Sequence, residues 1–122
     1  MSDLGVHEEE PVPLSRLECL AYLRSSSEGH LAYSRDGLLV VTPIVFDFVG
    51  GRIRLVATPR SVLGHAVGQV VTLQCDGVER LGARRWSVCA TGFVGRGHHE
   101  EMLLDPELFK GYWAERSARR SA

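Results

Sequence analysis

The stretch that decides the fold is residues 30–57, HLAYSRDGLLVVTPIVFDFVGGRIRLVA. Three apolar runs within it are separated by two turn motifs, Arg35-Asp36-Gly37 and Gly50-Gly51. Both motifs are typical of tight hairpin turns between antiparallel strands. The stretch therefore predicts three consecutive strands, over Leu31–Ser34, Leu38–Val49 and Arg52–Ala57.

Pro43 lies in the middle of the longest of these runs. Because proline cannot donate a hydrogen bond to a neighbouring strand, its position predicts a strand edge or a bulge. The next strand alternates, which places Ile53, Leu55 and Ala57 on one face and Arg54 and Val56 on the other.

Two further strands are predicted downstream, over Val70–Asp76 and Trp86–Val94. A short helix is predicted between the third and fourth strands. It would have Thr58 as N-cap and Pro59 at its first helical position, and it would run to about Val67.

Helices are also predicted near both ends of the chain. Ser15 and Glu18 form a capping box, and Leu17, Leu20 and Ala21 are expected to line the buried face of the helix that follows. At the other end, Asp105-Pro106-Glu107 is expected to open a final helix by the same cap-then-proline pattern. That helix would carry Leu108, Phe109, Tyr112 and Trp113.

Five strands with one helix among them and helices at both ends predict a mostly-β fold, a small closed barrel. Residues 1–13 are acidic and punctuated by prolines, so we expect a loose arm there and a single domain over residues 14–122. A length of 122 residues with 44% apolar residues is sufficient for one core.

Composition excludes several classes of partner and compartment. A net charge of −1 gives no electrostatic reason to expect nucleic acid or an anionic membrane. With an acidic N-terminus and no apolar run of membrane-spanning length, we expect a cytoplasmic protein. Cys19, Cys75 and Cys89 form no metal or redox motif and lie in apolar runs, so they are expected to be reduced core residues.

Beyond these patterns, the order of elements over about Glu18–Gly97 resembles the pyridoxamine 5'-phosphate oxidase-like split barrels. The resemblance is carried by the Gly29–Ala32 strand, the Val41–Phe46 strand, the Gly50–Ile53 hairpin and the Trp86–Gly92 strand. It implies a split β-barrel that forms a homodimer with two flavin mononucleotide (FMN) sites, each built from both subunits.

A candidate phosphate site lies at the step from strand to helix, where free N–H groups and the helix dipole favour anions. Its residues are Arg54, Ala57, Thr58, Arg60 and Ser61. From the residues alone, Thr58-Pro59 is also an ordinary helix cap beside two solvated arginines; the family resemblance favours phosphate binding. Where many members of the family carry a Ser-Lys pair, this chain has Ser61-Val62, and Arg60 is the candidate replacement for the lysine.

A candidate site for the flavin ring is the segment Thr42, Pro43, Ile44 and Val45. An apolar slot with free backbone groups suits a flat ring with a polar edge, and Pro43 interrupts strand pairing. By resemblance, Trp86 of a second subunit is a further candidate contact; a role in packing or in the dimer interface is the alternative for Trp86.

These residues lead to one functional hypothesis and two alternatives. The hypothesis is an FMN-dependent oxidoreductase whose small-molecule substrate and electron donor the sequence does not identify. The alternatives are a deazaflavin-dependent reductase on the same barrel and a non-enzymatic protein that binds flavin or haem. No metal site is expected, because adjacent histidines such as His98 and His99 point apart.

Overall fold

The structure, a computed structural model, describes residues 11–56, 61–79 and 84–115. Within these residues the helices are α1 (Arg16–Arg24), α2 (Ser61–Gly64) and a 3-10 turn, η1 (His98–Glu100). The strands are β1 (Val12–Pro13), β2 (Glu28–Arg35), β3 (Leu38–Val49), β4 (Arg52–Val56), β5 (Val70–Val78), β6 (Arg84–Arg96) and β7 (Met102–Glu115).

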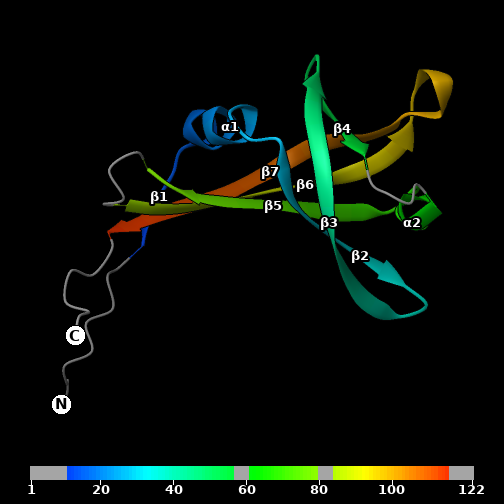
Figure 1. The fold of residues 1–122 in the computed structure, drawn as a ribbon, viewed down its shortest axis with the longest axis horizontal. Helices are drawn as coiled ribbons and strands as arrows, with labels where there is room; N and C mark the ends of the chain where they lie inside the picture. The colour runs from blue at the N-terminus through cyan, green and yellow to red at the C-terminus, as the bar shows by residue number, and fades with distance from the viewer. Residues whose placement is uncertain (1–10, 57–60, 80–83, 116–122) are drawn as a thin grey trace.

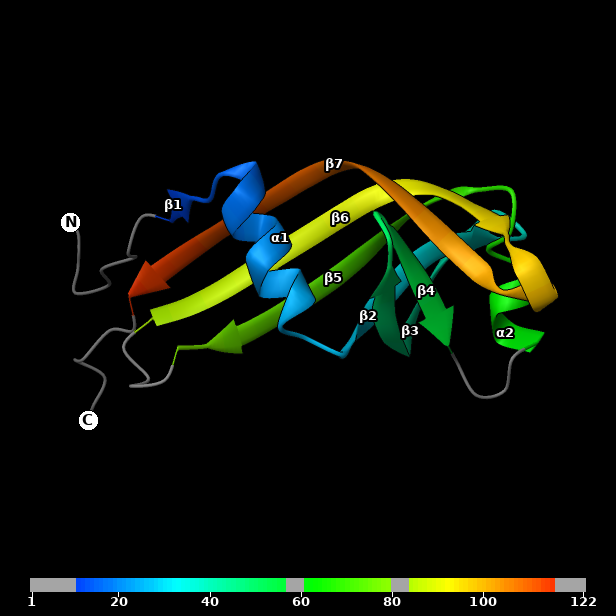
Figure 2. The same ribbon diagram turned by 90° about the horizontal axis from the view of Figure 1, so that it is seen from above.

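The strands, labelled in Figure 1, form one antiparallel sheet that closes on itself. Its order is β7-β4-β3-β2-β5-β6, and β6 pairs again with β7 to complete the ring, while β1 pairs with the far end of β7. Figure 2 shows β5, β6 and β7 running side by side, with α1 lying over them at one end and α2 at the other. The prediction of a mostly-β barrel is confirmed.

The first hairpin has the geometry that its sequence predicts. Asp36 and Gly37 connect β2 to β3 with φ angles of 53° and 80°. Two successive residues with positive φ match the right-handed twist of the flanking strands, and glycine adopts that conformation without strain. The turn therefore fixes the register in which Arg35 pairs with Leu38.

Helix α1 begins as predicted but buries a different face. Glu18 N–H donates to Ser15 Oγ at 3.1 Å, and Ser15 N–H donates to the Glu18 carboxylate at 2.8 Å, which completes the capping box. The buried residues are Cys19 and Leu23, whereas Leu17 is 77% exposed. The predicted face of Leu17, Leu20 and Ala21 was wrong, because the helix rests on β6 and β7 through a narrow i, i+4 stripe.

The middle helix is shorter than predicted. Helix α2 spans Ser61–Gly64 in place of the expected segment to Val67, and Thr58 and Pro59 lie outside the described residues. Past Gly64 the chain turns, with the Ala66 N–H donating to the Leu63 carbonyl at 2.8 Å, and then enters β5.

The predicted final helix is instead β7, and this is the main correction to the sequence analysis. The strand pairs with β6 from Met102 to Glu115. The proline that suggested a helix start sits at a bulge, where the register shifts so that Thr91 pairs with Leu108 and Gly92 with Pro106. Because a bulge tolerates a residue without an N–H, the Asp105-Pro106 pattern is compatible with a strand as well as with a helix.

The interior of the ring is apolar. Within the described residues no polar or charged residue is buried. Cys19 and Cys75 are buried free thiols, as predicted, and Cys89 is half-buried. Among the described helices, none is both long and apolar enough to cross a membrane. The largest fully buried side chains of the barrel are those of Leu23, Leu31, Phe46, Ile53, Leu63, Leu73 and Leu104.

The outside of the sheet also carries apolar side chains, in a line across five strands. Register places Val41, Ala32, Thr72, Thr91 and Leu108 next to one another on β3, β2, β5, β6 and β7. Val41 and Leu108 are more than half exposed, and the two threonine hydroxyls are 2.9 Å apart. We call this line the apolar row.

Candidate functional site

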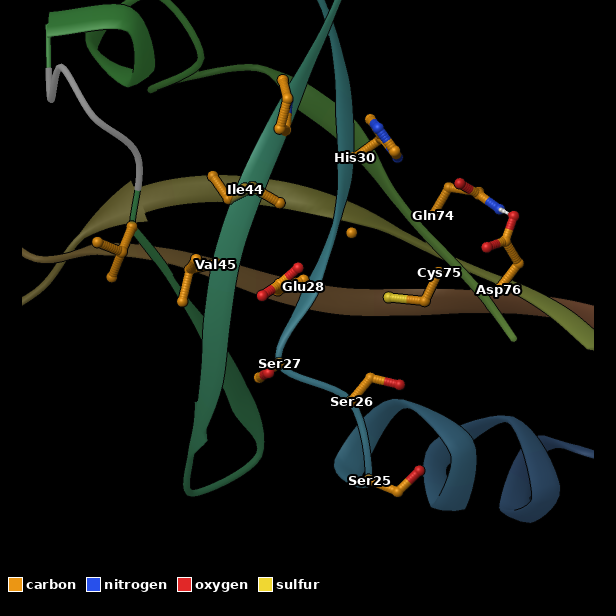
Figure 3. A pocket seen from close by; sticks show the side chains of 13 residues that line it. Ser25, Ser26, Ser27, Glu28, His30, Ile44, Val45, Gln74, Cys75 and Asp76 are labelled. Carbon is orange, nitrogen blue, oxygen red and sulfur yellow. Dashed lines mark hydrogen bonds between the residues drawn. The ribbon is translucent and has the colours of Figure 1, made fainter. Parts of the chain in front are cut away.

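A cleft of about 730 Å³ lies between the end of α1, β2, β3 and β5. Figure 3 shows Ser26 at the end of α1, Glu28 on β2, Val45 on β3 and Cys75 on β5. The volume lies in the range of sites for cofactors and small molecules. Its described lining is Ser25, Ser26, Ser27, Glu28, Gly29, His30, Pro43, Ile44, Val45, Val56, Gln74, Cys75 and Asp76.

One wall of the cleft is a strand edge of the predicted kind. Strand β3 pairs with β2 from Leu38 to Val45, but its pairing with β4 begins only at Val45. Among the described strands, the segment through Pro43 therefore has a neighbour on one side alone. Such an edge presents backbone N–H and C=O groups that no strand occupies.

The predicted ring site coincides in part with this cleft. Pro43, Ile44 and Val45 line it, and Val56 of β4 continues the same apolar wall opposite Val45. Thr42 is not among the lining residues; it pairs with Leu31, whose side chain is in the core.

The opposite wall is polar, and the sequence analysis did not identify it. The hydroxyls of Ser25 and Ser26 both donate to the Tyr22 carbonyl, at 2.8 and 2.9 Å. Across from them, the Gln74 side-chain amide donates to Asp76 at 3.3 Å, as the dashed line in Figure 3 marks. The only sequence signal was the alternation of polar Gln74 and Asp76 with apolar residues along the strand.

The charge of the cleft is acidic. Glu28 and Asp76 are exposed carboxylates at its rim, and none of the described lining residues is an arginine or a lysine. A negatively charged group is therefore disfavoured inside the cleft relative to a neutral or cationic one. The phosphate of a ligand would have to extend beyond this lining.

Cys75 places a protonated thiol against the cleft. Its side chain is only 2% exposed, and burial raises the pKa of the thiol to about 12. The thiol is therefore neutral at physiological pH and is a poor nucleophile there.

This burial predicts a pH-dependent contribution to stability. A thiol whose pKa is raised in the folded state stabilises the fold fully below its ordinary pKa of 9.0, and that contribution is lost as the pH rises toward about 12. We expect the difference in unfolding free energy between the wild type and Cys75→Ala to shrink steadily between pH 9 and pH 12. Urea titrations of both proteins at several pH values in this range measure the difference. A difference that stays constant over this range would contradict the assignment.

Arg54, the arginine of the candidate phosphate site that lies within the described residues, already has hydrogen-bond partners in the protein. Its Nε and Nη2 donate to the two carboxylate oxygens of Asp47 at 3.0 and 2.6 Å, and its Nη1 donates to Glu101 at 3.1 Å. These hydrogen bonds, with Asp47 as the larger cause, raise the pKa of the Arg54 guanidinium above its ordinary value. Arg54 lies on the same face of β4 as Val56, next to the cleft.

The other residues of the candidate phosphate site are only partly within the structure. Ala57, Thr58 and Arg60 lie outside the described residues, and Ser61 opens α2. Their role in phosphate binding stays a prediction.

Trp86 does not line the cleft of its own chain. Its ring stacks on Tyr22 with centroids 4.5 Å apart, and it borders a different hollow. The Tyr22 hydroxyl donates to Glu79 at 3.1 Å, and burial together with this hydrogen bond raises the pKa of Tyr22. These contacts support a packing role for Trp86 within the subunit.

Comparison with solved structures supports the assignment of the fold. The FAD binding protein from Mycobacterium smegmatis superimposes with a TM-score of 0.73 at 19% identity, covering 85% of this chain and 98% of that one. A FAD-binding protein from Mesorhizobium loti gives 0.73 at 18% identity, with the same coverage of 85% and 98%. At these identities the similarity shows the split-barrel fold. Among curated proteins, none matches this chain in sequence.

Comparison with family models identifies the family of this chain. The model for pyridoxamine 5'-phosphate oxidase matches residues 15–119, which includes the ring of strands and the lining of the cleft. The order of motifs that suggested this family from the sequence is thereby confirmed, and the chain belongs to the pyridoxamine 5'-phosphate oxidase family.

Proposed function

We propose that this protein binds a flavin, FMN in the first place, in the cleft between β3 and β5 and acts as an oxidoreductase on a small molecule. The observation that carries the proposal is the edge of β3 at Pro43, which has a partner on one side alone among the described strands and lines a cleft of about 730 Å³. The two similar structures described as FAD-binding proteins support a flavin without selecting FMN.

The residues of the cleft fit a flavin ring. Pro43, Val45 and Val56 provide an apolar surface for the flat ring, and the free edge of β3 provides donors and acceptors for its polar rim. When bound, the flavin supplies hydride and electron transfer. The protein's own part is to hold the ring, exclude water and admit a second small molecule along the serine-lined wall.

We also propose that the working unit is a homodimer. The apolar row lies two residues along the strands from Pro43, His30 and Gln74, which line the cleft. The two ends of the row, Val41 and Leu108, are exposed apolar side chains, and the threonine hydroxyls between them are paired with each other. Such a surface favours association, and two-fold dimers are the commonest form of homo-oligomer. A second copy on this face would cover the mouth of the cleft and help to exclude water.

A titration of the purified protein with flavins tests the proposal. Riboflavin, FMN and FAD are added in turn while flavin fluorescence and the absorption spectrum are recorded. Binding of any of them, with turnover of a nicotinamide donor in the presence of oxygen, supports a flavin oxidoreductase. Binding of a deazaflavin alone, a haem Soret band, or flavin binding without turnover would favour one of the alternative functions. No binding of any flavin overturns the proposal.

Filling the cleft should abolish binding. Val45→Trp introduces a large side chain into the apolar wall, so we expect FMN affinity to fall by about 100-fold or more, the cost of losing roughly 3 kcal/mol of contacts. Val49→Trp is the matched control, because Val49 lies on the same strand and the same face but outside the cleft. Equal effects of the two variants would show that the flavin binds elsewhere.

A further inference from the structure

Arg54 links three strands through two carboxylates. Asp47 is its direct cross-strand partner on β3, and Glu101 immediately precedes β7. The Asp47 carboxylate accepts hydrogen bonds from Nε and Nη2 of the guanidinium, and the Glu101 carboxylate accepts one from Nη1. Three of the five N–H groups of the side chain are therefore directed at protein carboxylates.

The guanidinium borders a small hollow beside the main cleft. The hollow has a volume of about 150 Å³ and shares Val56 with the cleft. Arg54 and Glu101 both line it, and the Glu101 side chain is 26% exposed. A negatively charged end of a ligand in the cleft would meet Arg54 here.

The local charges do not favour such a group. Among the described residues, the guanidinium of Arg54 faces the carboxylates of Asp47 and Glu101, while the neighbouring Glu100 is paired with Arg96 at 3.1 Å. A phosphate carries a charge of −1.5 to −2 at neutral pH. Its attraction to Arg54 would be opposed by its repulsion from the two carboxylates that accept hydrogen bonds from the same guanidinium.

We propose that Glu101 competes with the ligand's phosphate for Arg54 and so determines how strongly the site distinguishes phosphorylated from unphosphorylated flavin. The proposal rests on the proposed function. It makes Glu101 a specificity-determining residue: with its carboxylate in place, Arg54 holds the strands together and contributes little to phosphate affinity. Glutamine at this position keeps an oxygen that accepts from Nη1 and removes only the charge.

The experiment measures the dissociation constants of FMN and riboflavin for the full chain by fluorescence. The two ligands differ in the phosphate alone, so their ratio isolates its contribution. We expect Glu101→Gln to tighten FMN binding by about 3- to 10-fold, the effect of one charge at roughly 7 Å in a well-solvated site. Riboflavin affinity should not change. Glu107→Gln, which removes the same charge from an exposed position on β7, should affect neither ligand.

Two results would overturn the proposal. If Glu101→Gln weakens FMN relative to riboflavin, Glu101 instead orients Arg54 for the phosphate. If the ratio is unchanged, the charge of Glu101 has no influence on the ligand. Asp47→Asn removes the second carboxylate charge and gives the same test if Glu101→Gln does not fold.

A second measurement tests the competition for Arg54 without any flavin. Inorganic phosphate is titrated into the wild type and Glu101→Gln while the Arg54 Nε–H signal is followed by NMR. Tighter phosphate binding by the variant supports the competition even if no flavin binds, in which case only the proposed function fails. Equal or weaker binding by the variant overturns the competition even if flavins bind.

Discussion

Gly92→Ala is expected to lower the free energy of unfolding by more than about 3 kcal/mol, a large part of the stability of a domain of this size. Gly92 is buried in β6 at the bulge, opposite Pro106. A Cβ atom on Gly92 would overlap the carbonyl oxygen of Asp105 and lie 3.0 Å from Pro106 Cα. Because both obstacles are backbone atoms, β6 and β7 would have to separate at this point.

Gly95→Ala is the matched control in the same strand. Its nearest contact outside its chain neighbours would be a Phe93 ring carbon at 3.8 Å, an ordinary packing distance. We expect a drop in Tm of about 10 °C or more for Gly92→Ala and little change for Gly95→Ala. Thermal denaturation followed by circular dichroism measures both. Similar Tm values for the two variants would mean that the β6–β7 bulge adapts more easily than its geometry indicates.

Val41→Glu is expected to convert the proposed dimer into a monomer. Val41 is 58% exposed at the β3 end of the apolar row. A carboxylate buried there without a partner would raise the dimer dissociation constant by at least about 100-fold. FMN affinity should fall with it, because the dimer would cover the neighbouring cleft.

Leu17→Glu gives the control for this experiment. Leu17 is 77% exposed on α1, so it tests the effect of a new surface charge without touching the apolar row. Sizing chromatography with light scattering measures the mass of each variant. A monomeric wild type at micromolar concentration contradicts the dimer. A monomeric Val41→Glu that binds FMN as tightly as the wild type would show that one chain completes the site.

The sequence predicted the hairpins of the first three long strands, β2 to β4, because hairpins are determined locally. Asp36-Gly37 and Gly50-Gly51 each set a turn, and the alternation after Arg52 set which side chains face the core. Among the described strands, β3 has a neighbour at Pro43 on the β2 side alone, which agrees with the edge position that the proline predicted.

The error at β7 has a physical cause. The cap-then-proline pattern at Asp105-Pro106 is local, whereas the pairing that makes this segment a strand depends on β6 and β4. Alternation of Phe109, Gly111 and Trp113 toward the interior was present but was obscured by the proline. Contacts that are distant in sequence override a local preference for helix.

The candidate site was predicted only where it follows from strand geometry. Pro43, Ile44 and Val45 line the cleft, and their contact with a flavin ring stays a prediction. The polar wall and the partners of Arg54 were missed. Gln74 reaches the cleft only because β5 pairs with β2, and Glu101 reaches Arg54 only because β7 pairs with β4. Such encounters between distant segments have no local signal.

Closure of the ring by β7 also has a consequence for the synthesis of the protein on the ribosome. Strand β7 is the last of the described strands, and it supplies the neighbours of both β4 and β6. Until it has left the exit tunnel, the nascent chain exposes two open sheet edges, which invite pairing with other nascent chains. The nascent barrel is therefore most vulnerable to aggregation until β7 has emerged, and slower translation upstream of β7 would lengthen that exposure.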